Sequence, residues 1–476
     1  MTAPVSQLVS PRDLVSSGLC TGCGACVAAK DGGKGLRWDK DGLLRPFGPA
    51  GWYEGRAQAF SRICPFSPLA ANESEIAAAR FPIAPWGDGW VGRFEAAYVG
   101  HAAEPGFRER GSSGGMVSWV AAELLRRGLV DGVAHVAATD PGDGEDFFGY
   151  RMSRTVDEVC ARTKSCYYPV EMSAVLAEMR EVPGRYAIVG IPCFIKAVHL
   201  LCATDPVLCD RVVFTLGLVC GHMKSRHMVE SFSWQMGLSL KDVERIEFRL
   251  KNPDRPANWY TAQLACHDGE TRSRDWWHLV DGDWGSGFFQ NPACDFCDDV
   301  VAETADISFG DAWIEPYSSD GRGTNIVVVR SPGLHALLAE AIGEGRLDLT
   351  PVDAAFVKET QAAAFRQRRE GLAYRLRWRR KGVHPVKRVF PTGERPTLRR
   401  RLVYRCRHHI SRWSVRVFRL AKWLGRPGLF LAWGRSVLFV YHGFAYSRGW
   451  IGQTVDWAER ALSRPDKTSQ DALLPP

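Results

Sequence analysis

Apolar strands that alternate with amphipathic helices occupy the middle of the chain. Residues 185–191 and 211–219 are continuous apolar runs of strand length, and residues 116–127 repeat apolar positions at helical spacing. Such alternation is typical of parallel strands buried on both faces of a sheet. The pattern therefore predicts an α/β fold between residues 93 and 350. The other elements expected there are strands at 94–99, 132–136, 306–309 and 325–330, and helices at 172–180, 194–201 and 334–342.

The segments on either side have a different pattern. Residues 1–92 show weak periodicity and many Gly and Pro residues, and the stretch 81–92 is typical of a linker. Beyond residue 360, apolar and aromatic positions are interleaved with arginine. We therefore expect three regions: a loop-rich N-terminal segment (1–92), a central mixed α/β domain (93–359) and a basic helical C-terminal extension (360–476).

The composition is that of a globular protein with many cysteines. The 476 residues include 14 cysteines, and 45% of the chain is apolar, which suits a large core in two or three domains. The N-terminus has no basic stretch followed by an apolar one, so we expect no secretory signal. This predicts a cytoplasmic protein, where clustered cysteines bind metal or carry out redox chemistry rather than form disulfides.

A charge asymmetry lies behind the net charge of +8. Residues 366–426 hold 21 Lys and Arg but only two acidic residues, so the rest of the chain is acidic. Trp413 and Trp423 interrupt this basic run, a pattern that suits an anionic membrane surface or nucleic acid. The apolar residues 428–441 are broken by a charge, which predicts an interfacial segment rather than a membrane-spanning helix. Peripheral contact with the inner membrane surface is thus one expected use, and nucleic acid is the less favoured partner.

The first chemical motif is a set of four cysteines near the N-terminus: Cys20, Cys23, Cys26 and Cys64. Three cysteines spaced by two residues, with a distant Cys-Pro, are typical of a 4Fe–4S site, and Gly22 and Gly24 allow the loop to close around a cluster. The alternative is a structural zinc site, which more often uses two separated Cys-x-x-Cys pairs. A bacterial ferredoxin would place Cys-Pro where Lys30 stands, so the sequence is not an intact ferredoxin repeat.

A second set of four cysteines is scattered through the α/β region: Cys193, Cys220, Cys294 and Cys297. Cys193 and Cys220 each follow an apolar strand, and ligands gather at the carboxyl edge of open α/β sheets. The two cysteines are therefore expected to converge, with the Cys-x-x-Cys pair supplied by a later loop. The alternative is that they are ordinary core cysteines, which are common in apolar strands.

Two short motifs are candidates for binding a phosphate-bearing cofactor. Residues 111–115 (Gly-Ser-Ser-Gly-Gly) open a predicted helix, whose free N–H groups and dipole favour an anion. Lys164 and Ser165 combine a cation with a hydroxyl and precede two tyrosines. The alternatives are a turn with a helix cap for the first motif and an ordinary loop for the second. A Gly-x-Ser-x-Gly nucleophile at Ser113 is disfavoured because no strand precedes it.

The order of these motifs resembles a known family. The chain carries, in sequence, CTGCGAC, a later CP, RGSSGGMVSWVAAELLRRGLVDGV, TKSCYYPVEMSAVL, RYAIVGIPCFIKAV, LGLVCGH, CDFCDD and ADISFGDAW. Across residues 15–350 this set resembles the coenzyme-deazaflavin hydrogenase/dehydrogenase beta-subunit family, which also includes ferredoxin-dependent reductases of chlorophyll metabolism.

The resemblance implies an iron–sulfur flavoprotein. It implies two 4Fe–4S clusters on the two cysteine sets and an FAD that passes a hydride to or from a deazaflavin or another organic acceptor. In that interpretation the N-terminal segment is an iron–sulfur segment and the central domain binds the flavin. The residues implied as flavin contacts are Gly111, Ser112, Ser113, Gly114, Gly115, Lys164 and Ser165.

Three functions remain open at this level. The first is an oxidoreductase with a ferredoxin or deazaflavin partner, in which the basic extension recruits an acidic ferredoxin. The second is an electron-transfer subunit of a larger complex without a substrate of its own. The third is a zinc-structured binding protein. No proton donor can be assigned, since His135, His222 and His267 have no distinguishing context.

Overall fold

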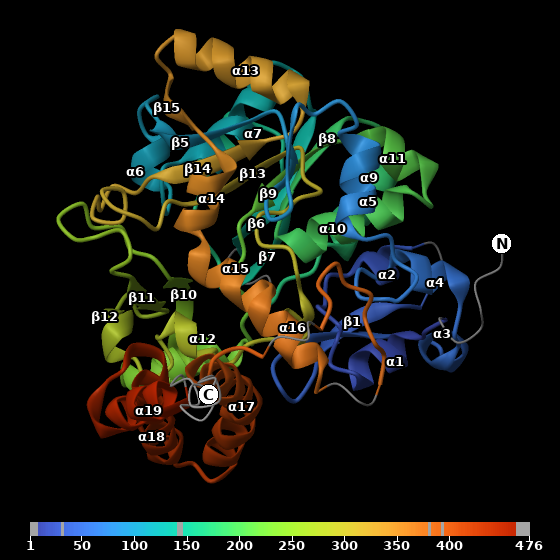
Figure 1. Ribbon diagram of the computed structural model, residues 1–476. Coiled ribbons are helices and arrows are strands. Elements are labelled where there is room, and N and C mark those ends of the chain that lie inside the picture. Colours follow the sequence, from blue (N-terminus) through green and yellow to red (C-terminus); the bar gives the residue numbers. More distant parts are fainter. Residues whose placement is uncertain (1–7, 30–32, 140–145, 379–381, 392–394, 463–476) are drawn as a thin grey trace, which may run out of the picture.

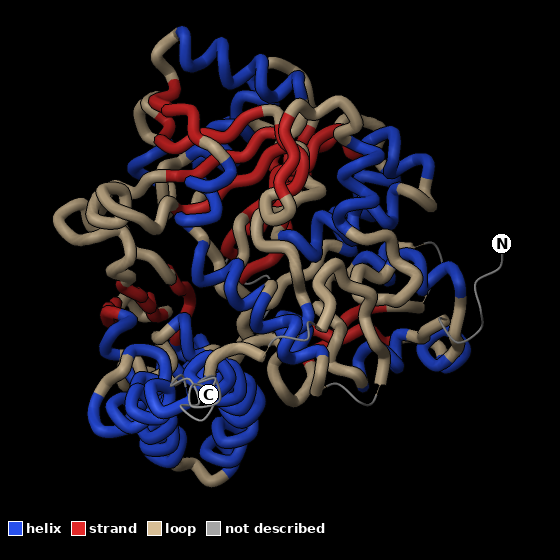
Figure 2. The backbone as a smooth tube through the Cα atoms, viewed as in Figure 1, coloured by secondary structure: helices blue, strands red, loops and turns tan. Residues whose placement is uncertain are grey.

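The computed structural model describes residues 8–29, 33–139, 146–378, 382–391 and 395–462. A large sheet with helices on both faces forms the upper body of the molecule (Figure 1). The N-terminal segment lies beside this body, and the C-terminal helices form the lower end of the view. Figure 2 shows a second, smaller group of strands between the large sheet and those helices.

The large sheet has eight strands in the order β15-β5-β14-β13-β9-β8-β6-β7. Its centre is parallel, since β13 pairs with β9, β9 with β8 and β8 with β6, whereas the outer pairs are antiparallel. The strands are β5 (Ala96–Ala102), β6 (Gly132–Ala138), β7 (Phe148–Ser153), β8 (Tyr186–Gly190), β9 (Val212–Leu218), β13 (Ile307–Asp311), β14 (Asn325–Val329) and β15 (Leu347–Val352).

Successive residues of these strands enter different cores, because strand side chains alternate between the two faces. In β8, Ala187 and Val189 pack in the core beneath α7 and α13, while Ile188 packs against α9 and α10 on the other face. The helices of the body are α6 (Phe107–Arg110), α7 (Met116–Arg126), α8 (Val156–Ala161), α9 (Ser173–Glu181), α10 (Pro192–Cys202), α11 (Pro206–Arg211), α12 (His227–Gln235) and α13 (Pro332–Gly343).

The N-terminal segment consists of short elements. They are α1 (Pro11–Ser16), α2 (Ala25–Ala28), β1 (Gly35–Trp38), β2 (Leu44–Phe47), α3 (Ala50–Glu54), α4 (Gln58–Ile63), α5 (Glu73–Arg80), β3 (Trp86–Asp88) and β4 (Gly92–Phe94). Strands β1 and β2 form one antiparallel pair and β3 and β4 another. The stretch 81–92, expected as a linker, therefore contains most of a hairpin.

The small antiparallel sheet packs with the C-terminal helices in one apolar core. The sheet and its neighbours are β10 (Val243–Glu247), β11 (Thr261–Cys266), β12 (Thr271–Asp275), η2 (Leu240–Asp242), η3 (Trp276–His278), η4 (Trp284–Ser286) and η5 (Pro292–Phe296). The chain ends in α14 (Ala354–Thr360), α15 (Ala362–Arg368), α16 (Glu370–Leu376), α17 (Leu398–Trp423), α18 (Pro427–Tyr446) and α19 (Gly449–Leu462). Phe418 and Phe430 from α17 and α18 are fully buried in this core.

The predicted α/β class and the helical C-terminal region are confirmed. The sheet is mixed rather than wholly parallel, because β14 and β15 on one side and β7 on the other run opposite to the parallel strands. Part of the basic run is internal, since Arg407 donates to the carbonyl of Gly285 at 2.6 Å and the buried Arg375 donates to the carbonyl of Asp295 at 2.9 Å. Among the described residues, no helix has the length and apolar character needed to cross a bilayer.

Candidate functional site

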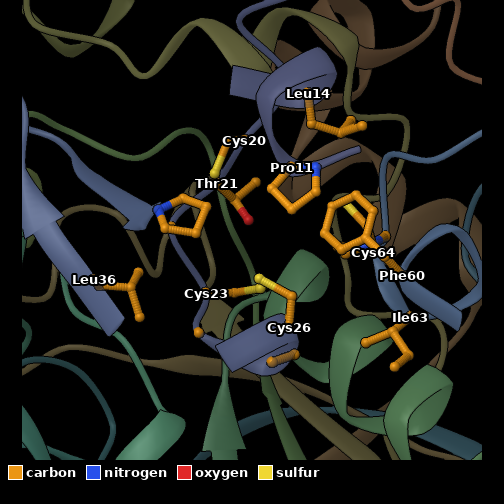
Figure 3. A pocket seen from close by; sticks show the side chains of 15 residues that line it. Pro11, Leu14, Cys20, Thr21, Cys23, Cys26, Leu36, Phe60, Ile63 and Cys64 are labelled. Atoms are coloured by element: carbon orange, nitrogen blue, oxygen red, sulfur yellow. The ribbon is translucent and has the colours of Figure 1, made fainter. Parts of the chain in front are cut away.

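The four cysteines of the first set line one pocket. Cys20, Cys23 and Cys26 come from the loop that leads into α2, and Cys64 follows the end of α4. Figure 3 shows their side chains around a common space, with Leu14 and Phe60 closing it on the apolar side. Four thiols that face one space are the donor set of a metal–sulfur cluster, and also that of a structural zinc ion.

Two glycines allow the cysteine loop to take this path. Gly22 and Gly24 have φ values of +75° and +85°, in the left-handed region that favours glycine. A side chain on Gly22 would also stand 2.7 Å from the carbonyl oxygen of Leu44. The loop is further held by Arg45, whose guanidinium donates to the carbonyl of Cys20 at 2.5 Å and forms an ion pair with Asp39 at 2.9 Å.

Burial disfavours the charged form of these thiols. It raises the pKa of Cys23 to about 11 and holds the pKa of Cys26 and of Cys64 above the ordinary range, and the neighbouring cysteines add to each shift. Four thiolates in one pocket therefore repel one another unless a cation compensates their charge. A positively charged metal centre supplies that compensation, and metal-bound thiols lose their protons.

The second cysteine set converges at the carboxyl edge of the large sheet. Cys193 lies in the first turn of α10, after β8, and Cys220 follows β9, the neighbouring parallel strand. Cys294 lies in η5 and Cys297 follows it. Burial raises the pKa of Cys193, and the nearby thiolates of Cys297, Cys220 and Cys294 raise it further. The structure thus brings together four cysteines from three separate parts of the chain.

Arg368 lies against the second set. Its guanidinium donates to the carbonyl oxygens of Gly221, Cys294 and Cys220 at 2.6, 3.0 and 3.4 Å. Burial by itself lowers the pKa of Arg368, but the thiolates of the second set raise it above its ordinary value. The backbone N–H of Met223 donates to the sulfur of Cys294 at 3.2 Å. These groups are placed to stabilise negative charge on a sulfur-bound centre.

The two cysteine sets are neighbours. Cys26 and Cys64 of the first set and Cys193 and Cys297 of the second belong to one apolar cluster. The charge of Cys23 also contributes to the raised pKa of Cys193. Within the described part of the chain, no three His, Cys, Asp or Glu side chains stand close enough to hold a single metal ion. A four-iron cluster is larger than one ion and holds its thiolates further apart.

The candidate flavin residues also come together. The backbone N–H of Ser165 donates to the hydroxyl of Ser112 at 2.9 Å, which joins the Lys164–Ser165 segment to the loop 111–115. Ser112 lines a polar pocket together with Arg249, Lys251 and Tyr260. The ammonium of Lys251 donates to the carbonyls of Arg108, Ser113 and Arg322, so it is fixed in the wall of the pocket. The site therefore combines hydroxyl groups, cations and an aromatic ring beside a glycine-rich loop.

Part of the glycine motif is explained by packing. Gly115 has a φ of +80°, and a side chain on Gly114 would stand 2.8 Å from Oδ1 of Asn325. That same oxygen accepts the N–H of Met116 at 3.2 Å, so one of the free N–H groups of α7 already has a partner. Lys164 forms an ion pair with Glu247 at 2.7 Å. Ser112 is thus the residue of the predicted motif that lines the pocket itself.

Several residues of the site are not indicated by any sequence motif. Arg249 and Lys251 lie on the loop after β10, and Arg368 lies in α15, within the basic run 366–426. None of them has a motif or a spacing that distinguishes it from a surface cation. Of the three histidines considered, His135 bonds Ser153 at 2.8 Å and is buried, and burial lowers its pKa to about 4. His222 is the histidine that lies near a cysteine set, because its ring stacks on Trp284 beside the second set.

Comparison with known proteins identifies the family of the chain. Residues 97–177 match the family model described as coenzyme F420 hydrogenase/dehydrogenase, beta subunit N-term, and residues 184–355 match the companion model for the C-terminal part of the same kind of subunit. No protein with a curated description matches the chain. Among solved structures, the chain is similar to one in the F420-reducing NiFe hydrogenase complex from Methanosarcina barkeri. The two share 17% identity with a TM-score of 0.47, over 63% of this chain and 99% of that one.

The fold and the matched regions define the class of protein, an oxidoreductase subunit of mixed α/β architecture. The two family models together cover more than half of the chain. The chain belongs to the coenzyme F420 hydrogenase/dehydrogenase beta-subunit family. Because coenzyme F420 is a deazaflavin, the family is the one that the sequence motifs resemble.

Proposed function

We propose that this protein is an iron–sulfur flavoprotein that relays electrons between two 4Fe–4S clusters, an FAD and an organic acceptor such as a deazaflavin. The observation that supports it most is the shared apolar cluster of the two cysteine sets. Two sets of four thiols side by side, each thiol buried or half-buried, have no evident role in packing alone. When bound, the clusters carry single electrons and the flavin exchanges one or two, which couples electron input to hydride chemistry.

In this proposal each cysteine set holds one cluster. The first set would bind through Cys20, Cys23, Cys26 and Cys64, and the second through Cys193, Cys220, Cys294 and Cys297. The protein around them excludes water with residues such as Leu14 and Phe60. Arg368 and the N–H of Met223 offset negative charge at the second set. These features set how readily a bound centre accepts an electron.

Aromatic rings connect the second cysteine set to the polar pocket. Trp284 packs against Gly221, where a side chain would stand 2.6 Å from its indole nitrogen, and its ring lies 6.1 Å from that of Trp276. Trp276 in turn lies 5.5 Å from Tyr260, which lines the pocket. Packed aromatic rings therefore lie between the two sites. Such a packed connection favours electron exchange between groups bound at its two ends.

The polar pocket is the site we propose for the flavin. Ser112, Arg249 and Lys251 offer a hydroxyl and two cations, which suits the pyrophosphate of a dinucleotide. Arg249 is held in place by Asp311, at 3.0 Å, and lies over the ring of Tyr260. Lys164 and Ser165 stand at the edge of the same site through the bond from Ser165 to Ser112.

We expect flavin affinity to fall as pH rises through about 8. Burial lowers the pKa of Lys251 to about 8, so its ammonium is charged below that pH and neutral above it. A bound pyrophosphate favours the charged form, and affinity should then fall by up to about tenfold per pH unit above 8. FAD binding measured by fluorescence titration between pH 7 and pH 9 tests this.

The matched variant for this prediction is Lys251→Met. It should weaken FAD binding at pH 7 by about tenfold or more, because a positive charge beside the phosphates is lost, and the pH dependence should disappear. Arg245→Gln removes an exposed cation outside the pocket and should change neither quantity. If Lys251→Met keeps the wild-type pH profile, the charge of Lys251 does not act on the phosphates.

An electron-transfer subunit that needs a catalytic partner is the second candidate. The family description favours it, since it names beta subunits. In that case a ferredoxin or a partner subunit delivers or removes the electrons. Purification of the native protein under anaerobic conditions separates the candidates, because a stable larger complex supports the subunit, whereas a free chain that oxidises a reduced deazaflavin supports the enzyme.

Metal and flavin analysis of one anaerobic sample tests the proposal itself. We expect roughly eight iron atoms, about eight sulfides and about one FAD per chain. Roughly four iron atoms with flavin would restrict the proposal to one cluster and remove the second set from it. Zinc without sulfide or flavin would contradict the redox function and favour a zinc-structured binding protein.

A further inference from the structure

The turn between α17 and α18 lies at the far end of the C-terminal helices, away from the large sheet (Figure 1). These two helices form the lower part of the view, away from the large sheet (Figures 1 and 2). Their inner faces are buried, with Phe418 and Phe430 fully covered. The outer face of the last turns of α17 and the first turn of α18 is open.

Large apolar side chains stand exposed on this outer face. Trp423 is 79% exposed and Trp413 is 47% exposed. The exposed leucines nearby are Leu420, Leu424 and Leu429. Positions 413, 420 and 423/424 recur at helical spacing, so these side chains lie along one stripe of α17 that continues into the turn. We call the stripe, the turn and their exposed arginines the tip surface.

The tip surface carries positive charge that nothing opposes. The whole stretch 395–455 contains 13 Lys and Arg and no Asp or Glu. Arg412, Arg416 and Arg426 are exposed and form no ion pair within the described residues. By contrast, Lys422 and Arg419, which point back to the body, pair with Glu230 and Asp41. The unpaired cations are thus those that face outward.

We propose that the tip surface docks on an anionic lipid bilayer. Tryptophan favours the level of the lipid headgroups, and arginines beside it contact anionic headgroups. An amphipathic helix with this arrangement lies in the interface plane and inserts its apolar side chains without crossing the bilayer. The exposed leucines favour lipid over nucleic acid, which stacks its bases on aromatic rings in a groove and has no use for aliphatic side chains at a projecting turn.

Vesicle co-sedimentation of the full-length protein tests this. The probes are vesicles of phosphatidylcholine alone and vesicles that also contain phosphatidylglycerol. We expect sedimentation with the anionic vesicles only, and weaker binding at high salt. Trp423→Ser should weaken binding by about tenfold, and the triple variant Arg412→Gln/Arg416→Gln/Arg426→Gln by about a hundredfold.

Matched controls separate docking from a general effect of charge. Arg37→Gln/Arg62→Gln/Arg245→Gln makes the same change in net charge on the exposed surface of the body. Trp277→Ser removes another tryptophan, which is 65% exposed. Both control variants should bind as the wild type does.

Three outcomes would overturn the proposal. One is the absence of wild-type binding to anionic vesicles, and another is an equal loss of binding in the tip and control variants. The third is retention on heparin that the tip variants abolish while vesicle binding is absent, which would assign the surface to a nucleic acid or another soluble polyanion. Because the readout is binding, none of these outcomes depends on the proposed redox function.

Discussion

Cys26→Ala is expected to lower the iron content by about four atoms per chain and to leave the second cysteine set loaded. Cys26 lines the pocket of the first set with Cys20, Cys23 and Cys64, and no other cysteine lines that pocket among the described residues. The N-terminal segment has short elements and depends on this site for part of its core, so its stability should also fall. Iron, sulfide and flavin measured on the purified variant, together with its thermal unfolding, test both effects.

A second cysteine variant serves as the control. Cys266→Ala removes a buried cysteine on β11 that belongs to neither set. It should keep roughly eight iron atoms and one FAD per chain, at the cost of a small cavity. Wild-type iron content in Cys26→Ala would show that the first set does not hold a cluster. A loss of all iron would show that the two sets assemble as one unit, which their shared apolar cluster makes physically reasonable.

The elements of the large sheet were predictable because burial on both faces leaves a clear apolar pattern. Residues 185–191 and 211–219 were expected as strands and appear as β8 and β9, side by side and parallel. The reversed direction of β7, β14 and β15 was not predicted, because strand pairing depends on contacts far apart in the sequence. The β3–β4 hairpin was not predicted either, because its Gly and Pro residues are typical of a linker.

Some residues of the candidate site could be predicted from the sequence, and others could not. The spacing of Cys20, Cys23 and Cys26 is local, so the sequence alone indicated a cluster site. The convergence of Cys193 and Cys220 could be argued from strand ends, since parallel strands share a carboxyl edge. Arg368 and Lys251 could not be found by either route, because a buried cation and a solvated one look alike in a sequence.

The structure changes the interpretation of the C-terminal extension. Its first part supports the second cysteine set, because Arg368 bonds the carbonyls around Cys220 and Cys294, and Arg375 donates to the carbonyl of Asp295 at 2.9 Å. Deleting residues 361–476 would therefore remove side chains that hold the second cysteine set along with any docking surface. Recruitment of an acidic ferredoxin by this extension stays a prediction that only exposed-charge variants can test.

Arg368→Met is expected to lower the free energy of unfolding by about 3–5 kcal/mol and to shift the midpoint potential at the second set. The stability falls because a buried charge partner is removed and three carbonyl acceptors lose their donor. The potential becomes more negative because a cation that offsets the thiolate charge is gone. We expect about 60 mV or more, which corresponds to about tenfold in the equilibrium constant of a one-electron couple. Redox titration followed by electron paramagnetic resonance measures the shift.

Arg330→Met is the control that separates the loss of stability from the shift of the midpoint potential. Arg330 is fully buried and donates to Ser308 at 3.1 Å and to three backbone carbonyls. Burial lowers its pKa to about 10, and its nearest opposing charges are carboxylates rather than thiolates. This variant should lose comparable stability without a change of potential. Arg368→Lys keeps the charge but loses the forked geometry, so it should restore much of the potential and little of the stability. An unchanged midpoint potential in Arg368→Met would mean that Arg368 stabilises the loop around Cys294 without affecting the charge at the second set.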